Sequence, residues 1–446
     1  MRVSIAGAGY VGLVTGVCLA EKGHDVICVD IDAEKVAMMR EGNPPIFEKG
    51  LDELLKKHIS NKIMATTDLE EAVSSTDITI IAVGTPFNGK EISLDFIRDA
   101  ARQIGNILRN KDSYHLVVVK STVIPGTTDT VVLPILEESS GKQAGADFGV
   151  GMNPEFLREG VAIEDFMTPD RIVIGGIDDK SRQTLAALYD GFPDTKKFMT
   201  NNKTAELIKY ASNSFFAMLI SFSNEIANLC SLIGGIDAVD VMKGVHVDRR
   251  ISPLQPDGKR VSPSLVTYLE AGCGFGGSCF PKDLKAICAF GDKVGNPFRI
   301  LNAVVEVNER QPGQISNFLR KHFKRFDGLK ITALGLAFKP GTDDMRESPS
   351  IPIINELRAQ GAQVTAYDPG ASDQARKILG DDAIVYAETL DDAIVGADAI
   401  VVLTRWEEFR RLPELLDKVG EPYPLVVDGR RLLNKESVKR YEGIGL

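Results

Sequence analysis

The sequence predicts an α/β fold in which two doubly wound, mostly parallel sheets are joined by a long central helix. Three features lead to this prediction. Over the first 200 residues, short β-branched runs alternate with amphipathic stretches, as they do in βαβ units. An uninterrupted helical pattern follows at 204–233, and the strand–helix alternation returns from residue 329. The chain is therefore expected to divide into domains at 1–200, 201–312 and 313–446.

The first sheet is expected to come from the N-terminal part of the chain. Its predicted strands are the apolar runs at 3–6, 26–30, 78–83, 116–120 and 171–174. Its predicted helices lie at 33–40, 94–108 and 180–188. Because helices cover both faces of such a sheet, its strands are nearly continuous apolar runs rather than alternating ones.

The C-terminal part repeats the pattern of the N-terminal part. LKITALGLAF at 329–338 parallels MRVSIAGAGY at 1–10, and GAQVTAYDPG parallels GHDVICVDID. Each βαβ unit ends in an acidic residue, Asp30 in the first and Asp368 in the second. Unrelated βαβ segments also look alike, so a true repeat and a chance likeness both stay open. Either one gives two α/β domains that flank a helical middle in the sequence.

The long helix and the composition narrow the class of protein. The helix is apolar on more than one side, which indicates a connector that also packs against a partner subunit. Polar residues such as Ser221, Asn224 and Glu225 interrupt it, so it is not expected to cross a membrane. The chain has 62 acidic and 52 basic residues, a net charge of −10, which argues against a nucleic-acid-binding protein.

The six cysteines include no CxxC pair, and no secretion signal is recognised before the first predicted strand. Reduced, mostly buried thiols in a soluble cytoplasmic protein are therefore expected. No metal site is predicted.

Gly7, Gly9 and Gly12 form a GxGxxG motif between a predicted strand and a predicted helix. The first glycine permits the turn, the second lets the backbone approach a pyrophosphate, and the third allows the helix to pack on the strand. Asp30 ends the next strand, about 20 residues on, where a carboxylate binds a ribose 2′-hydroxyl and disfavours a 2′-phosphate. The first domain is therefore predicted to be a Rossmann-like domain that binds NAD.

The second α/β domain is expected to bind a different phosphate ligand. It keeps only Gly335 of the glycine pattern, with Ala337 and Lys339 following. Loss of the other glycines argues against a second dinucleotide site. Lys339 would supply the positive charge for a phosphate.

The segment GCGFGGSCFPKD at 272–283 carries the most specific chemistry. A glycine-rich loop leads into Ser278, a good N-cap, and then into Cys279 at the start of a predicted helix. A helix N-terminus and the nearby Lys282 favour the thiolate form of this cysteine. Asp283 lies four residues later on the same helix face. Cys273 lacks these features and is expected to be a buried thiol.

Four segments together resemble the UDP-glucose/GDP-mannose dehydrogenase family. They are the cysteine loop, GAGYVGLVTGVCLAEKGHDVICVD at 7–30, NPEFLREG at 153–160 and LAFKPGTDDMRESPS at 336–350. The resemblance covers essentially the whole chain in the family's order. It implies oxidation of C6 of a nucleotide sugar from alcohol to acid with two NAD⁺, without release of the aldehyde. A thiolate can hold the aldehyde as a thiohemiacetal, which loses a second hydride to become a thioester that water cleaves.

The resemblance also implies which residues react. Cys279 is the nucleophile, and Asp283 assists proton transfer or water activation. Lys209 and Asn213, four apart on the long helix, would stabilise a developing oxyanion. Which group acts as the general base stays open, because Lys209, Asp283 and Glu155 would titrate together.

Thr122 and Glu155 complete this set, since they resemble residues that position a water molecule and tune proton transfer. The implied cofactor contacts are Gly7, Gly9, Tyr10, Val11, Gly12, Asp30, Lys35, Thr85, Thr122, Glu159 and Arg346. The implied nucleotide-sugar contacts are Glu155, Phe156, Leu157, Lys209, Asn213, Arg250, Tyr268, Phe275, Gly276, Lys339 and Arg430.

Arg250 resembles an arginine that reaches the sugar site of a neighbouring subunit, so a homodimer or higher oligomer with a shared active site is expected. The adjacent Arg249 is the alternative for this assignment. Tyr268 is expected to stack on a base.

The nature of the sugar is suggested by a few residues. The phenylalanine in SCFPKD and the FLREG segment favour UDP-glucose, whereas the segment 252–267 is longer than the family pattern predicts. GDP-mannose and other nucleotide sugars stay open as substrates. Two further readings are a two-electron hydroxyacid dehydrogenase and a catalytically silent nucleotide-sugar or NAD sensor. Cys279 beside Asp283 speaks against the first, and the presence of all the expected reactive residues speaks against the second.

Overall fold

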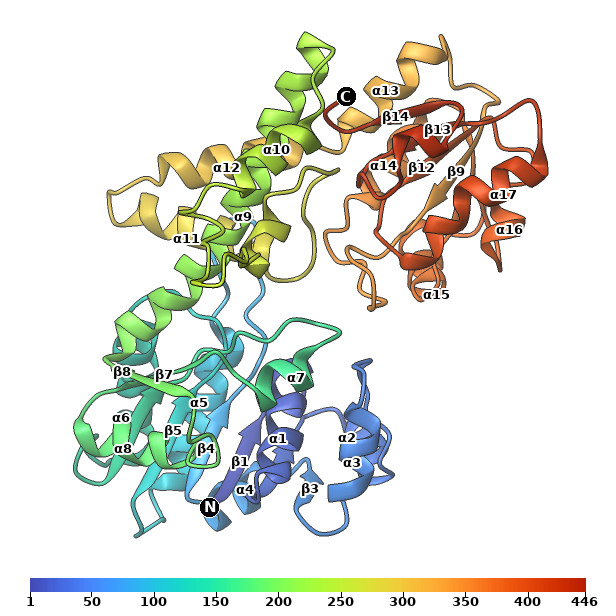
Figure 1. The fold of residues 1–446 in the computed structure, drawn as a ribbon. Coiled ribbons are helices and arrows are strands. Elements are labelled where there is room, and N and C mark those ends of the chain that lie inside the picture. The colour runs from blue at the N-terminus through green and yellow to red at the C-terminus, as the bar shows by residue number, and fades with distance from the viewer. The chain divides into compact units, whose positions relative to one another are not determined.

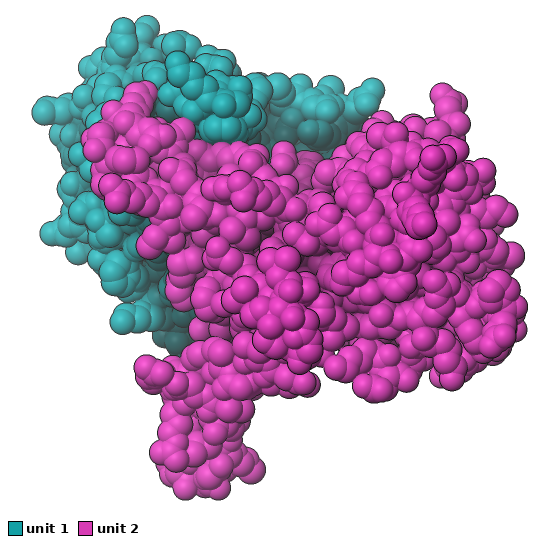
Figure 2. Space-filling model, turned by 90° about the horizontal axis from the view of Figure 1, so that it is seen from above, with its two compact units in different colours: residues 1–212 teal, residues 213–446 magenta.

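The computed structural model describes residues 1–446, which form two compact units, Met1–Ser212 and Asn213–Leu446. Each unit contains its own doubly wound sheet with helices on both faces (Figure 1). Figure 2 shows the surface that each unit forms, with residues 1–212 in teal and residues 213–446 in magenta. The predicted α/β fold with two Rossmann-like sheets and a long helix is confirmed. The boundary between the units lies inside the long helix, so the division at 200 and 312 stays a prediction.

The sheet of the first unit has eight strands in the order β3-β2-β1-β4-β5-β6-β7-β8. All neighbouring strands are parallel except β6 and β7, which are antiparallel. The four residues of β4 and the five of β5 are all buried, as expected for strands covered on both faces. The strands are β1 (Arg2–Ala6), β2 (Asp25–Val29), β3 (Ile63–Thr66), β4 (Ile78–Ile81), β5 (His115–Val119), β6 (Phe148–Met152), β7 (Arg171–Gly176) and β8 (Lys196–Thr200).

Two apolar cores lie on the two faces of this sheet, one beneath α1, α3 and α7 and one beneath α5 and α6. Asp32, Asp68 and Asp178 cap α2, α4 and α8 by accepting hydrogen bonds from amides of the first turn. The helices are α1 (Tyr10–Glu21), α2 (Ala33–Arg40), α3 (Leu51–His58), α4 (Leu69–Ser75), α5 (Asp95–Leu108), η1 (Thr128–Val132), α6 (Leu133–Ser140), α7 (Ala162–Met167) and α8 (Asp179–Ala187).

The long helix α9 (Asn202–Ile233) has 32 residues and runs without a break from the first unit into the second. Its polar residues Ser221 and Asn224 are buried in the second unit, where they bond to Val304 O at 2.9 Å and to the amide of Gly272 at 2.8 Å. By length and composition alone, α9 is apolar enough to cross a membrane, a test that core helices of globular proteins also pass.

The segment between α9 and the sheet of the second unit is helical, and its last helix packs on that sheet through Ile315, Phe318 and Leu319. Its helices are α10 (Ala238–His246), η2 (Ser264–Tyr268), α11 (Phe280–Lys293), α12 (Arg299–Arg310) and α13 (Gly313–His322).

A six-stranded, wholly parallel sheet follows, in the order β11-β10-β9-β12-β13-β14. The first five of these strands have the same spatial order as β1 to β5, an order that both a true repeat and a chance likeness of βαβ segments would give. The strands are β9 (Lys330–Leu334), β10 (Gln363–Tyr367), β11 (Ile384–Tyr386), β12 (Ala399–Val402), β13 (Leu425–Asp428) and β14 (Tyr441–Gly443). The helices are α14 (Ser350–Ala359), α15 (Ser372–Leu379), α16 (Leu390–Ala393), η3 (Glu407–Arg411), α17 (Leu412–Val419) and η4 (Lys435–Ser437).

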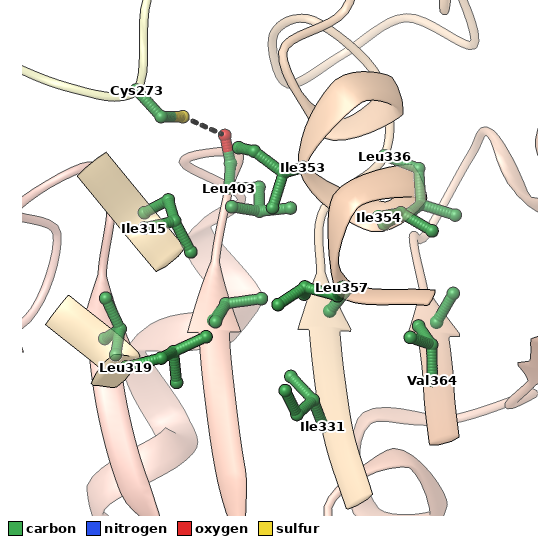
Figure 3. Packing of buried hydrophobic residues seen from close by; sticks show 14 of the residues in the cluster. Cys273, Ile315, Leu319, Ile331, Leu336, Ile353, Ile354, Leu357, Val364 and Leu403 are labelled. Atoms are coloured by element: carbon green, nitrogen blue, oxygen red, sulfur yellow. Dashed lines mark hydrogen bonds between the residues drawn. The ribbon is translucent and has the colours of Figure 1, made fainter. Parts of the chain in front are cut away.

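The core of this sheet continues to the cysteine loop. Ile353, Ile354 and Leu357 of α14 pack over the strands, and Cys273 lies at the edge of the same cluster (Figure 3). The thiol of Cys273 donates to Leu403 O at 3.7 Å. Cys273 is fully buried, and burial raises the pKa of its thiol, as expected for a structural cysteine.

Candidate active site

The loop after β1 has the geometry of a phosphate-binding turn. Gly7 adopts a φ of +98°, and a side chain on Gly12 would collide with the carbonyl oxygen of Gly7. A Cβ on Gly9, in contrast, would meet no protein atom within 4 Å. No side chain caps α1, so its first amides are available to a ligand. The backbone requires the first and third glycines, and the second one leaves room for a pyrophosphate.

Asp30 and Asp368 occupy equivalent positions in the two sheets, but their carboxylates differ. Asp30 is half-buried and accepts one amide on each oxygen, from Ala8 at 2.9 Å and from Asp32 at 3.0 Å. Asp368 is 3% exposed and accepts five hydrogen bonds. Its donors are Leu336, Ala337, Gly370, Ala371 and the indole of Trp406. Each oxygen of Asp368 therefore already accepts at least two hydrogen bonds, whereas each oxygen of Asp30 accepts one and can accept another from a ribose hydroxyl.

Glu48 is a buried residue near the glycine loop that the sequence motifs did not predict. Its carboxylate accepts hydrogen bonds from the hydroxyl of Tyr10, the amide of Gly160 at 2.7 Å and the amide of Ala162 at 2.9 Å. Glu48 is 5% exposed. Its hydrogen bonds connect Tyr10, which follows the glycine loop, to Gly160 at the end of the FLREG segment. Burial and the neighbouring Glu48 raise the pKa of Tyr10. No motif surrounds Glu48, so no sequence signal pointed to it.

The carboxyl ends of β4 and β5 bring two predicted cofactor residues together. The hydroxyl of Thr85 donates to Thr122 O at 2.8 Å. The loop that carries Thr122 is fixed at its far end by Glu206 of α9, which accepts from the amides of Gly126 at 2.5 Å and Thr128 at 2.8 Å. Lys35 lies in the first turn of α2, is 42% exposed and has its ammonium 3.9 Å from Asp32 Oδ2.

Glu155 and Lys209 form a buried ion pair in the first unit. Lys209 Nζ lies 2.7 Å from Glu155 Oε1, and the other carboxylate oxygen accepts the amide of Leu157 at 2.6 Å. Burial acts to raise the pKa of Glu155, but Lys209 outweighs it, so this pKa lies below its ordinary value. The ring of Phe156 lies 5.6 Å from Lys209 Nζ and 4.0 Å from the guanidinium of Arg171.

A second lysine, Lys120, lies buried near this pair and was also missed. Its ammonium donates to Asn153 Oδ1 at 2.8 Å, and the hydroxyl of Tyr189 donates to the same oxygen at 2.5 Å. Burial lowers the pKa of Lys120 to about 8, with Glu155 acting to raise it and Lys209 to lower it.

Cys279 lies at the N-terminus of α11 in the second unit and is the one exposed cysteine. The prediction that Ser278 caps this helix is wrong, because the N-cap position falls on Cys279 and no side chain accepts an amide there. The hydroxyl of Ser278 instead lies 3.5 Å from Cys279 Sγ. Pro281 occupies the first helical turn, as predicted.

Asp283 is 1% exposed and is held by two donors. The amide of Asn213 lies 2.7 Å from Asp283 Oδ2, and Lys282 Nζ lies 2.6 Å from Asp283 Oδ1. Lys282 was predicted to lie near the thiol, but its ammonium pairs with the carboxylate of Asp283. Asn213 likewise holds Asp283 through its amide nitrogen.

The glycine-rich loop before Cys279 is clamped through its backbone. Asn308 of α12 bonds both the amide and the carbonyl of Phe275, at 2.8 and 3.1 Å. Gln311 and Arg430 donate to Gly272 O at 2.8 Å and Gly274 O at 2.9 Å. A side chain on Gly276 would collide with Glu347 O. The loop conformation therefore depends on partners far away in sequence, of which only Arg430 was predicted.

The remaining predicted sugar and cofactor residues vary in exposure. The ring of Tyr268 packs on Phe216 of α9, with centroids 4.4 Å apart, so one of its faces is already covered. Arg250 is 88% exposed and pairs with Asp248 at 2.6 Å. Arg346 pairs with Asp344 at 2.7 Å, and Lys339 lies 5.4 Å from the ring of Phe338. None of these contacts joins Arg250, Tyr268, Lys339 or Arg346 to another of them.

Three family models match the chain in order, and together they cover most of it. They describe the UDP-glucose/GDP-mannose dehydrogenase family, as its NAD binding domain at 1–193, its central domain at 203–310 and its UDP binding domain at 332–435. The chain belongs to the UDP-glucose/GDP-mannose dehydrogenase family. It is an NAD-dependent oxidoreductase of this family, and the open glycine loop with Asp30 fits that cofactor.

Relatives named for different nucleotide-sugar substrates have similar sequence identities to this chain. The UDP-glucose 6-dehydrogenase of Haloferax volcanii is 42% identical, with all of both chains covered. The GDP-mannose 6-dehydrogenase of Pseudomonas savastanoi pv. phaseolicola is 39% identical over 94% of this chain and 96% of its own length. The solved UDP-glucose dehydrogenase of Pyrobaculum islandicum is 39% identical with a TM-score of 0.90, covering 99% of this chain and 97% of its own.

Proposed function

We propose that this family member oxidises UDP-glucose to UDP-glucuronate in two hydride transfers through a covalent intermediate on Cys279. The observation that carries the proposal is the exposed Cys279 at the N-terminus of α11, one turn before the buried Asp283. A two-electron dehydrogenase has no use for a nucleophile at this position. The proposed functional parts are an NAD-binding part at 1–200, a dimerising part at 201–312 and a UDP-sugar-binding part at 313–446.

The first oxidation removes a proton from the C6 hydroxyl and a hydride from C6. The glycine loop would hold NAD⁺, which would supply the hydride acceptor. Lys209 and Asn213 lie one turn apart on α9 and would donate to the C6 oxygen as its negative charge develops. Glu155, Lys209 and Asp283 form the coupled set from which the proton acceptor comes.

The second oxidation requires the sugar to be held covalently. The thiolate of Cys279 adds to the aldehyde carbon, and the resulting thiohemiacetal loses a second hydride and a proton to give a thioester. Water, positioned by Thr122, Glu155 and Asp283, then cleaves the C–S bond, which releases the carboxylate and the thiol. One alcohol, two NAD⁺ and one water thus give one carboxylate, two NADH and three protons.

A homodimer built through α9 is part of the proposal. Phe215, Phe222 and Leu229 recur every seven residues along α9, and 44%, 46% and 52% of their surfaces are exposed. An apolar stripe with this spacing fits the same stripe on a second copy. Arg250, or its neighbour Arg249, would then reach the sugar site of the partner. A cytoplasmic location suits the free thiols.

The test is a panel of nucleotide sugars in which NADH and product are both counted. We expect two NADH per UDP-glucose consumed, with lower kcat/KM for GDP-mannose and for UDP-N-acetylhexosamines. One NADH per sugar would contradict the thioester route. A preference for GDP-mannose would retain the chemistry and change the substrate. Tight binding without any NADH would indicate a silent sensor.

A further inference from the structure

Lys120 is a buried cation to which the proposed reaction assigns no part. Its side chain is 3% exposed, and its ammonium is bonded to an amide oxygen of Asn153 rather than to a carboxylate. Burying a charge without a carboxylate partner is costly, so such groups are rare away from functional sites. Methionine or leucine would fill the same space at lower cost.

The sheet places Lys120 directly behind the reactive residues. Lys120 follows β5 and precedes Thr122 by two positions, and Asn153 follows β6 and precedes Glu155 by two positions. The backbone N–H of Asn153 donates to Val119 O at 2.9 Å, so the carboxyl ends of β5 and β6 lie side by side. The Lys120–Asn153 bond therefore connects the two loops that carry Thr122 and Glu155.

The charges near Glu155 are unbalanced. Two ammonium groups, those of Lys120 and Lys209, act on this one carboxylate, and all three side chains are buried. The other groups that face Lys120 are neutral: the hydroxyl of Tyr189 on Asn153 and the ring of Phe166, 6.0 Å from the ammonium. Lys209 lies on the far element, α9, and bonds Glu155 directly.

We propose that Lys120 is a positioning residue whose ammonium keeps Glu155 ionised and thereby holds Lys209 in place for the reacting oxygen. This inference rests on the proposed function of Glu155 and Lys209. Lys120 itself does not touch the substrate; it acts through Glu155. Its bond to Asn153 also sets the distance between the Thr122 and Glu155 loops.

The test compares Lys120→Met and Lys120→Arg with the wild type by the pH dependence of kcat. Lys120→Met removes the charge but keeps the length of the side chain. We expect its acidic limb to move to higher pH by about one unit, since a nearby opposite charge lowers a carboxyl pKa by about that much. Lys120→Arg keeps the charge and should leave the limb within about 0.3 units of the wild type. An equal loss of kcat at every pH in Lys120→Met would overturn the proposal.

Two further variants separate charge from structure. Tyr189→Phe removes the other donor to Asn153 Oδ1 without changing any charge, and it should leave the pH profile in place. Asn153→Asp gives Lys120 a carboxylate partner, at the cost of the 2.8 Å bond from Asn153 Nδ2 to Val173 O, and should shift the profile in the same direction as Lys120→Met. A shift in Tyr189→Phe, or none in Asn153→Asp, would contradict the role of charge. Asn153→Asp also serves if Lys120→Met does not fold.

A readout without substrate keeps the inference distinct from the proposed function. The pKa of folded Lys120 is lowered from 10.5 to about 8, so the unfolded chain binds more protons in this window and the unfolding free energy rises with pH there. Lys120→Met and Asn153→Asp should both lose this rise. If it persists, Lys120 is not the buried cation described here, whichever sugar is oxidised. If it is lost but no sugar is oxidised, the proposed function alone has failed.

Discussion

The side-chain amide of Asn213 donates to Asp283 Oδ2 at 2.7 Å, and Asp283 is 1% exposed. The long helix thus holds the acid that lies one turn after Cys279 in a fixed orientation. The ammonium of Lys282 donates to the other carboxylate oxygen, Oδ1, so both oxygens of Asp283 accept a hydrogen bond.

Replacing Asp283 by Asn keeps the shape of the side chain and removes its charge and proton-accepting ability. We expect Asp283→Asn to lower kcat by about 10²- to 10⁴-fold, the usual effect of losing a general acid or base. Rapid-quench measurement of NADH and of protein-bound sugar would show whether a covalent intermediate accumulates. Asp292→Asn, an exposed acid further along α11, is the matched control and should retain full turnover.

Replacing Cys279 and replacing Cys273 are expected to have opposite effects on activity and on stability. Cys279→Ala removes an exposed nucleophile, so we expect normal unfolding and a loss of turnover of more than about 10³-fold. Cys273→Ala removes a buried thiol from the core in Figure 3, so we expect lower thermal stability with the stoichiometry of two NADH retained. Full overall activity in Cys279→Ala would rule out covalent catalysis.

Alanine substitutions at Gly9 and Gly12 are expected to affect cofactor binding and folding separately. A methyl group on Gly9 meets no protein atom within 4 Å, so Gly9→Ala should fold normally and bind NADH at least about tenfold more weakly. On Gly12 the same group meets the carbonyl oxygen of Gly7, so Gly12→Ala should unfold at a lower temperature. Fluorescence titration with NADH and thermal unfolding measure the two effects. Equal NADH affinity in Gly9→Ala and wild type would place the pyrophosphate elsewhere.

Glu206 predicts a pH dependence of stability. Burial raises its pKa from 4.5 to about 7, so the folded protein binds more protons than the unfolded chain between these values. The unfolding free energy should therefore fall as pH rises from 4.5 to 7, by up to about 3 kcal/mol at 1.4 kcal/mol per pKa unit. Denaturant unfolding of Glu206→Gln should lack this slope. The exposed Glu138→Gln, in which the slope should persist, is its control.

The apolar stripe on α9 predicts the oligomeric state. Phe222→Arg places a charge in the centre of this stripe, so we expect a monomer by light scattering and a loss of activity. Ile300→Arg changes an apolar side chain that is 66% exposed outside α9 and should leave the assembly intact. A dimer in Phe222→Arg would locate the interface elsewhere.

The fold was predictable because its signals are local. Strand runs, helix periods and the GxGxxG turn depend on residues a few positions apart, and they led to both sheets, the long helix and the pairing of Asp30 with the glycine loop. The motifs around Cys279 and Glu155 likewise led to the side chains that are proposed to react. The sequence therefore determined the architecture, the family and the candidate catalytic residues.

The partners of those residues were decided only by the tertiary structure. Glu48 bonds Gly160 across 112 positions, and Asn308 clamps Phe275 across 33. Lys120 meets Asn153 because β5 and β6 are neighbours in the sheet. Asp368 has the same sequence context as Asp30, yet its oxygens are filled by the surrounding loop and Trp406. Hydrogen-bond partners and burial depend on which strand ends lie next to each other, and a linear pattern of residues does not contain that adjacency.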